Sequence, residues 1–321
     1  MSRVGLVLGG GGISGASYEM AALMAIEMAT GWNPNDAEVI VGTSAGSFVA
    51  GVVRAGRLEL SSMVEHSDNR GDVAARISSY VFKGARPGGV RRWVRHGLVP
   101  GIRRPGVRLV LGSPGRYSAD GIRDWATVQI GDECAYTWPD RPTLISAYNL
   151  ETKQRVVFGT DEAPDVSMRD AVAASSAVPV IFSPHRIDGL HYVDGGVVSG
   201  THADVVLGSP DPLDLVLVLA PMAADNARDG AFFYENLLDR VGKSALDEEI
   251  RMIGQAWPST DVVVLRPSPE VLEVMRPNPM KPESAVPTFI KTLTSMRTKL
   301  ARASVWSVLR DHLGDHRTVA G

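Results

Sequence analysis

The sequence has little of several things that define common protein classes. It has one cysteine, Cys134, among 321 residues, so neither an intramolecular disulfide nor a cysteine-rich metal site can form. The apolar stretch at residues 215–220 is far shorter than the ~20 residues of a membrane-spanning helix. Positive and negative charges nearly balance, at 33 against 36, so the chain as a whole does not attract nucleic acid. These absences argue against a cysteine-rich metal site and a nucleic-acid partner, and we expect no cofactor.

The rest of the composition is that of a soluble globular protein. Hydrophobic residues make up 44% of the chain and charged residues 21%. The N-terminal apolar run, residues 4–8, is too short for the core of a signal peptide. These features predict a cytoplasmic protein without a signal peptide or transmembrane helix, in which any contact with a membrane is peripheral.

The first part of the chain predicts alternating strands and helices. Strands are predicted at residues 4–8 and 38–42, each followed by an apolar helix, at residues 17–29 and up to about residue 55. This alternation implies parallel strands joined by right-handed crossovers. Further strands are predicted at 143–147, 155–158, 214–220 and 261–266, with a helix at 167–177. The expected fold class is α/β with a mostly parallel sheet.

We expect a single domain over residues 1–321, with its motifs between residues 4 and 204. The strand pattern disappears from about 57 to 119, which predicts a helical or loop-rich insertion. A C-terminal helical extension is expected from about 225 to 321. Seven prolines between residues 258 and 287 predict an irregular connection before the last helix.

Two glycine-containing motifs follow the first two predicted strands. Residues 10–15, Gly-Gly-Gly-Ile-Ser-Gly, match the G-x-G-x-x-G pattern of a dinucleotide-binding loop. That interpretation also needs an acidic residue at the end of the second strand, where this chain has Gly42-Thr43-Ser44-Ala45-Gly46. The second motif matches the G-x-S-x-G nucleophile elbow, in which Ser44 would project above the sheet from a sharp strand-to-helix turn. The alternative is that Ser44 only caps a helix.

The glycine loop and the elbow support each other because they lie at the ends of adjacent strands. Acyl transfer forms an oxyanion, which preorganised backbone N–H groups usually stabilise. Gly10, Gly11 and Gly12 offer such groups without side chains in the way. The two motifs together predict a serine nucleophile beside an oxyanion hole.

A serine nucleophile needs a base, and the sequence offers two kinds. His185, His191 and His202 all follow the elbow and remain open as partners. Asp194 is the stronger candidate, because Gly195 and Gly196 after a short strand would present its carboxylate on a tight turn. Without that context, the Asp-Gly pair would indicate an ordinary hairpin turn.

Four motifs, in this order, resemble those of the patatin-like phospholipases, a family of lipid acyl hydrolases with a Ser/Asp dyad. They are Gly10 to Gly15, Gly42 to Gly46, Ala173 to Pro179 and Asp194-Gly195-Gly196. The resemblance spans residues 4–204 and implies a three-layer α/β/α core without a catalytic histidine or metal. It also implies that Ser44 is the nucleophile, Asp194 the base and Gly10, Gly11 and Gly12 the oxyanion-hole loop.

The sequence departs from this family at one position. The family commonly carries Arg or Lys just before the last glycine of the loop, where this chain has Ser14. A positive charge is therefore missing near the place of an oxyanion or lipid phosphate, although Gly15 and the backbone donors remain.

The resemblance implies an enzyme that hydrolyses lipid carboxylic esters through an acyl-enzyme on Ser44. One alternative is a catalytically impaired lipid-binding or scaffold protein of the same fold, which Ser14 favours. The other is a histidine-assisted esterase that acts on small soluble esters.

Two basic stretches predict peripheral contact with an anionic membrane. Residues 83–108 contain eight basic and no acidic residues, interleaved with Trp93, Leu98 and Val99. Residues 284–310 contain five basic and no acidic residues, with apolar positions at helical spacing. The alternative for both is a solvated face of a helix packed on the core. A mobile lid is a further alternative for residues 83–108.

Overall fold

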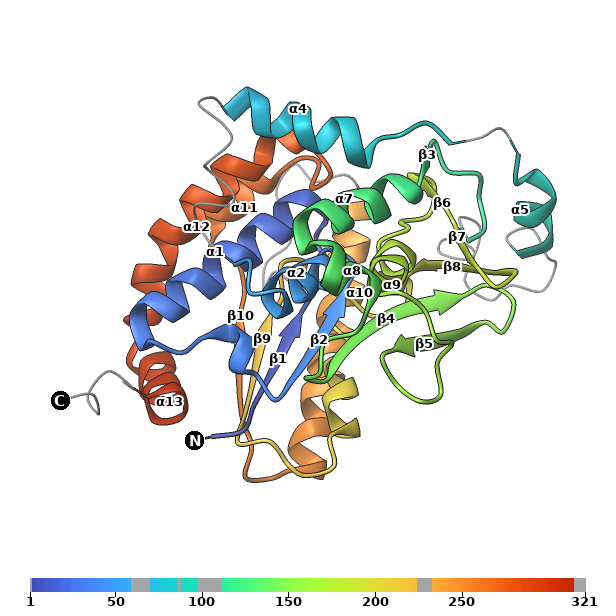
Figure 1. The fold of residues 1–321 in the computed structure, drawn as a ribbon. Coiled ribbons are helices and arrows are strands. Elements are labelled where there is room, and N and C mark those ends of the chain that lie inside the picture. Colours follow the sequence, from blue (N-terminus) through green and yellow to red (C-terminus); the bar gives the residue numbers. More distant parts are fainter. Residues whose placement is uncertain (1, 59–69, 86–87, 97–110, 224–232, 315–321) are drawn as a thin grey trace.

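A mostly parallel β-sheet forms the centre of the molecule in the computed structural model (Figure 1). The structure describes residues 2–58, 70–85, 88–96, 111–223 and 233–314. Within these residues eight strands form the sheet: β1 (Val4–Leu8), β2 (Val39–Thr43), β4 (Thr143–Asn149), β5 (Gln154–Phe158), β7 (His185–Ile187), β8 (Leu190–Asp194), β9 (Leu215–Leu219) and β10 (Asp261–Leu265). A separate parallel pair consists of β3 (Tyr117–Ser118) and β6 (Phe182–Ser183).

The order of the strands is β10-β9-β1-β2-β4-β8-β7, with β5 also paired to β4. From β10 to β4 all neighbours are parallel, whereas β5 and β8 run antiparallel to β4, and β7 runs antiparallel to β8. The strands predicted at residues 4–8, 38–42, 143–147, 155–158, 214–220 and 261–266 are all present, with ends shifted by at most two residues.

The α-helices of the described residues are α1 (Gly12–Thr30), α2 (Ala45–Arg54), α4 (Arg70–Val81), α5 (Val90–His96), α7 (Asp120–Ile130), α8 (Asp132–Tyr136), α9 (Met168–Ser175), α10 (Phe233–Ala256), α11 (Pro269–Met275), α12 (Ala285–Leu300) and α13 (Ala303–Leu313). Short 3-10 helices are η1 (Pro34–Asp36), η2 (Gly195–Val197), η3 (Ala203–Gly208) and η4 (Pro282–Ser284). None of the described helices is long and apolar enough to cross a membrane.

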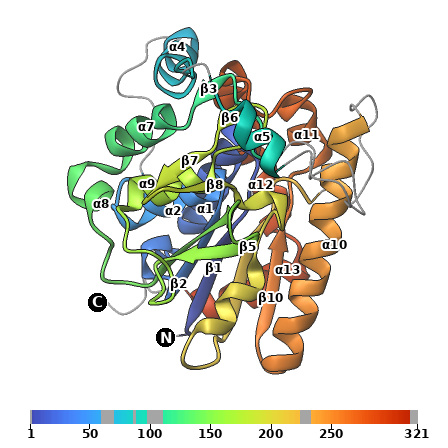
Figure 2. The same cartoon turned by 90° about the vertical axis from the view of Figure 1, so that its right-hand side faces the viewer.

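Side chains alternate between the two faces of the sheet, and helices cover both. Leu6 and Leu8 of β1 pack in the core cluster that includes α1, α2, α9 and α12. Val7, between them, packs on the opposite face with Leu246 and Ile253 of α10. Figure 2 shows α10 on one side of the sheet and α2 and α9 on the other. The fold is therefore the expected three-layer α/β/α sandwich.

The first helix begins earlier than its sequence pattern predicts. α1 starts at Gly12, directly in the glycine loop, rather than at Ser17. Glycine is a poor helix former, but tertiary packing overrides this preference, since α1 is buried along most of its length and packs against α2 and α12. The loop therefore leads straight into a helix N-terminus.

The C-terminal part of the chain is built into the core. β10 extends the main sheet beside β9, and α12 packs against α1. Phe289, Met296 and Leu300 of α12 are buried, so much of the apolar spacing seen in residues 284–310 faces the protein interior. The proline-rich residues 258–287 contain β10, α11 and η4 between short connections.

The region from 57 to 119 adds α4, α5 and β3, and its described residues contribute no strand to the main sheet. Part of the basic stretch, including Leu98 and Val99, lies outside the described residues. The helix predicted at 167–177 is confirmed as α9, with Ser167 as N-cap accepting a hydrogen bond from the Asp170 amide.

We expect Gly46→Ala to destabilise the fold severely. A Cβ atom at Gly46 would lie 2.1 Å from the carbonyl oxygen of Leu8, so α2 would have to move away from β1. The expected loss is roughly 3 kcal/mol or more in the free energy of unfolding. Gly254→Ala in α10 is the matched control, because no atom lies within 4 Å of its added Cβ. We expect the control to be stabilising by about 0.5–1 kcal/mol. Urea denaturation measures both, and equal effects would contradict this account of the elbow.

Candidate active site

Ser44 lies on a sharp turn between β2 and α2. Its φ of 53° and ψ of −119° are a strained backbone conformation for a residue with a side chain. Gly42 and Gly46 permit the turn, because a Cβ at Gly42 would lie 2.7 Å from the Ser47 Cα atom. The strand-turn-helix predicted around Ser44 is therefore present, with the serine at the strained position of the turn.

Three other serines hold this turn through its backbone. The Ser44 N–H donates to the Ser175 Oγ atom at 2.9 Å, and the Ser175 hydroxyl donates to the Ser146 carbonyl at 2.7 Å. The Ser44 carbonyl accepts from the hydroxyl groups of Ser176, at 3.0 Å, and Ser47, at 2.6 Å. The surrounding structure therefore fixes the strained conformation of Ser44.

Asp194 lies at the end of β8, with its carboxylate on Ser44. The Ser44 hydroxyl donates to the Asp194 Oδ2 atom at 2.6 Å, and the Gly196 N–H donates to Oδ1 at 2.7 Å. The residues after Asp194 form η2, so the Asp-Gly pair is not a hairpin turn. Gly195 must lack a side chain, because a Cβ there would lie 2.5 Å from the Ser146 carbonyl oxygen.

The pairing of β4 explains how residues 150 positions apart meet. Thr43 of β2 pairs with Ser146 of β4, and Asp194 of β8 pairs with the next residue, Ala147. Because β5 occupies the other edge of β4 from residue 145 to 149, β2 and β8 must share one edge. The end of β2 therefore meets the end of β8, and each end carries one member of the pair.

Burial raises the pKa of Asp194 to about 6, although the hydrogen bonds from Ser44 and Gly196 oppose that rise. The side chain is almost completely buried, at 5% exposed. Above that pH the carboxylate is ionised, and its short hydrogen bond to a hydroxyl suits a general base. This arrangement can remove the Ser44 proton during nucleophilic attack.

The glycine loop lies against Ser44, but its amides are not equivalent. A Cβ at Gly10 would lie 3.3 Å from the Ser44 Cβ atom, which places the loop beside the serine. The Gly10 N–H already donates to the Gly200 carbonyl at 2.7 Å. Gly11 precedes α1 and Gly12 is its first residue, and among the described residues no acceptor bonds the N–H group of either one. In this structure the Gly10 amide is therefore occupied, whereas those of Gly11 and Gly12 have no acceptor among the described residues.

Ser14 is completely buried, and both its N–H and its hydroxyl donate to the Pro279 carbonyl, at 3.0 and 3.3 Å. Ser14 is therefore covered by the chain between α11 and α12. Gly15 lies beside Pro221, and its N–H donates to the Gly11 carbonyl at 2.8 Å. Both residues support the loop without reaching Ser44.

The three candidate histidines form their hydrogen bonds with residues other than Ser44 and Asp194. His185 bonds Asp170 at 2.9 Å and His191 bonds Glu151 at 2.8 Å. His202 bonds Thr43, the residue before Ser44, at 3.1 Å. Within the described part of the chain, none of these rings hydrogen-bonds to Ser44 or Asp194.

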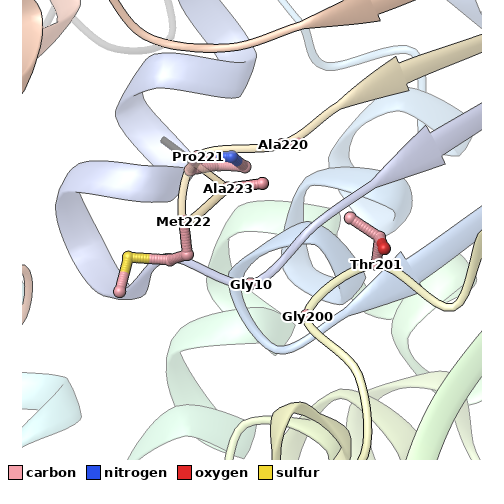
Figure 3. A pocket seen from close by; sticks show the side chains of 7 residues that line it. All are labelled: Gly10, Gly200, Thr201, Ala220, Pro221, Met222 and Ala223. Carbon is pink, nitrogen blue, oxygen red and sulfur yellow. The ribbon is translucent and has the colours of Figure 1, made fainter. Parts of the chain in front are cut away.

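A small, mostly apolar hollow adjoins the glycine loop (Figure 3). Its lining residues are Gly10, Gly200, Thr201, Ala220, Pro221, Met222 and Ala223. It has room for only about one water molecule, so it is too small for an acyl chain.

Several contacts that build the site were not predicted from the sequence. The block Ala173 to Pro179 contacts the Ser44 turn and the Asp194 turn, because Ser175 and Ser176 hold Ser44 while the Ala177 carbonyl accepts from the Asp194 N–H at 3.1 Å. Its sequence indicated a family motif but no function. The sequence offered His202 as a candidate base, but it did not indicate the contact of that ring with Thr43.

We expect Asp194→Asn to stabilise the protein at neutral and alkaline pH. In the wild type the pKa of Asp194 is raised on folding, so stability falls as the pH rises from about 4 to 6 and stays lower above that range. The amide keeps the contacts to Ser44 and Gly196 without the buried charge. Urea denaturation at pH 8 should show a gain of roughly 1–3 kcal/mol that shrinks toward pH 4. A gain independent of pH would contradict this explanation.

Two solved structures are similar to this chain. The chain is similar to human GIVD cytosolic phospholipase A2, at 12% identity and a TM-score of 0.47, covering 98% of this chain and 63% of that one. It is also similar to VipD from Legionella pneumophila, at 14% identity and a TM-score of 0.41, covering 97% and 67%.

A curated relative is the cGAMP-activated phospholipase of Escherichia coli (strain TW11681), 29% identical over 117 residues. The match covers 34% of this chain and 31% of that protein, so the chain spans about a third of this relative. The sequence model of the patatin-like phospholipases matches residues 6–207, which is more than half of the chain and includes the glycine loop, Ser44 and Asp194. This match to a family of phospholipases supports lipid hydrolase activity. The protein belongs to the patatin-like phospholipase family.

Proposed function

We propose that the protein is a lipid acyl hydrolase in which Ser44 is the nucleophile and Asp194 the general base. The observation that carries this proposal is the 2.6 Å hydrogen bond from the Ser44 hydroxyl to a buried carboxylate. Membership of a phospholipase family supports a lipid ester as the substrate. The strained elbow and the free amides of Gly11 and Gly12 supply the remaining requirements of acyl transfer.

The reaction takes two steps. Asp194 accepts the Ser44 proton as the Oγ atom attacks the ester carbonyl, and the amides of Gly11 and Gly12 stabilise the oxyanion together with the free Ala45 N–H at the start of α2. The intermediate collapses, the C–O bond breaks, and the proton passes from Asp194 to the departing alcohol or lysolipid. Water then attacks the acyl-enzyme, gives its proton to Asp194, and the carboxylic acid leaves as Ser44 is reprotonated.

Covalent labelling with a fluorophosphonate tests the nucleophile and the base together. We expect one adduct on Ser44, none in Ser44→Ala, and labelling at least 100-fold slower in Asp194→Asn. Hydrolysis of a fluorescent lipid ester should fall in parallel. Labelling of Ser44→Ala at the wild-type rate would refute the assignment, and an unaffected Asp194→Asn would refute the base.

The pH dependence provides a separate test of Asp194. Because the base must be ionised, kcat/KM should rise about tenfold per pH unit up to about pH 6 and then level off. The measurement is the initial rate on a soluble ester between pH 4.5 and 8.5. An acid limb near pH 4, as for an exposed carboxyl, would show that Asp194 is not the controlling group.

We also propose that α5 contacts anionic membranes. Val90 and Val94 are 60% and 51% exposed and lie one helical turn apart. Arg91 and Arg95, also exposed and one turn apart, form the adjacent stripe. Figure 1 shows α5 at the edge of the molecule, away from the central sheet. Exposed apolar and basic stripes side by side suit a surface of anionic lipid.

Sedimentation with vesicles tests this contact. Arg91→Gln/Arg95→Gln should weaken binding to phosphatidylglycerol-containing vesicles about 30-fold, since each basic residue contributes about 1 kcal/mol. The matched control is Arg76→Gln/Lys153→Gln, which removes two exposed charges outside both basic stretches and should change little. Equal losses in both variants would indicate a general charge effect and contradict a role for α5.

A further inference from the structure

The His202 side chain lies between the two turns that carry Ser44 and Asp194. Its Nδ1 atom is 3.1 Å from the hydroxyl of Thr43, which precedes Ser44. On the other side, a Cβ atom at Gly195 would lie 3.2 Å from the His202 Cε1 atom. One imidazole ring therefore contacts the neighbours of both members of the pair, and it is completely buried there.

The backbone around His202 is held firmly from two sides. The residue has φ 52° and ψ 41°, the left-handed conformation. The Ser199 hydroxyl accepts from the N–H groups of Thr201 and His202, each at 3.2 Å. Glu249 of α10 accepts from the Thr201 hydroxyl at 2.6 Å and from the Ala203 N–H at 2.8 Å. The chain on both sides of His202 is therefore anchored from the opposite layer of the fold.

Burial keeps this ring neutral. The pKa of His202 is lowered to about 3, chiefly by burial and secondarily by the positive charge of Arg155. The charged groups nearby are Arg155, which is paired with Asp204 at 2.8 Å, and Glu249 of α10, in addition to Asp194. Among the described residues, no partner bonds the Nε2 atom. A ring without charge can act on the pair through shape and through one hydrogen bond.

We propose that His202 is a positioning residue that fixes the nucleophile turn against the base turn and keeps water out from beneath Asp194. This inference rests on the proposed Ser44–Asp194 mechanism. His202 is not the base, because its ring bonds Thr43 rather than Ser44. Its contact with Thr43 fixes the end of β2, and its contact with Gly195 fixes the start of η2. A rigid, fully buried ring in this place holds the hydroxyl and the carboxylate at hydrogen-bonding distance.

The test compares variants of His202 and Thr43 by the rate of fluorophosphonate labelling and by the pH profile of kcat/KM. His202→Ala removes both the ring and the hydrogen bond. We expect labelling to be at least 10-fold slower. We also expect the midpoint of the acid limb of kcat/KM to fall by half a pH unit or more, because water would reach Asp194 and lower its raised pKa. His202→Asn tolerates the left-handed backbone and can restore the contact with Thr43, so it should recover at least half of the lost rate.

Thr43→Val breaks the same contact from the other side and keeps the test decisive if His202→Ala does not fold. Thr43→Val should slow labelling. The double variant Thr43→Val/His202→Asn should label no more slowly than the slower of the two single variants. His185→Asn is the matched control, since His185 is also buried but bonds Asp170 on α9. It should leave the acid limb unchanged.

Three outcomes would overturn the proposal. One is a folded His202→Ala protein with wild-type labelling and an unchanged pH profile. Another is an equal shift of the acid limb in His185→Asn. The third is a loss in His202→Ala as complete as in Ser44→Ala without recovery in His202→Asn, which would make His202 the base. Labelling of Ser44→Ala would instead refute the proposed function, and this result can be told apart from the three outcomes that refute the role of His202.

Discussion

The site depends on the way β4 pairs with its neighbours. One edge of β4 carries β2 and then β8, so Thr43 and Asp194 lie opposite consecutive residues, Ser146 and Ala147. A shift of one residue in the register of β8 would move Asp194 along the edge and turn its side chain to the other face, and the same shift in β2 would displace Ser44. The hydrogen bond between Ser44 and Asp194 is therefore a consequence of sheet pairing, and the surrounding turns refine it.

The surrounding contacts share one purpose, which is to hold polar groups in a buried place. Ser175 and Ser176 satisfy the backbone of the strained Ser44, and Gly196 donates to the Asp194 carboxylate. Burial costs stability, because it raises the pKa of Asp194 above its value in the unfolded chain. In the mechanism we propose, the same raised pKa makes Asp194 a more effective base, because a general base works best with a pKa near the working pH. That mechanism would therefore trade stability of the fold for reactivity of Ser44.

Sequence reasoning succeeded where a pattern is local. The G-x-S-x-G elbow, the strands on either side of it and the Asp-Gly-Gly motif all depend on residues next to each other in the chain. The sequence predicted less where the role of a residue depends on partners that are distant in the chain. The amide of Gly10 is occupied by the carbonyl of Gly200, which no pattern in the glycine loop reveals. In the same way, the early start of α1 depends on packing against α12, more than 250 residues later in the chain.

The sequence by itself determined the fold class, the turn that presents Ser44 and the identity of the carboxylate candidate. Local geometry is encoded in glycine positions and apolar spacing, which act over a few residues. Only the tertiary structure decided which amides are free, which histidine lies beside the pair and how strongly Asp194 is desolvated. Those properties are set by burial and by contacts between β4, β8, α9 and α10, segments that meet only once the chain has folded.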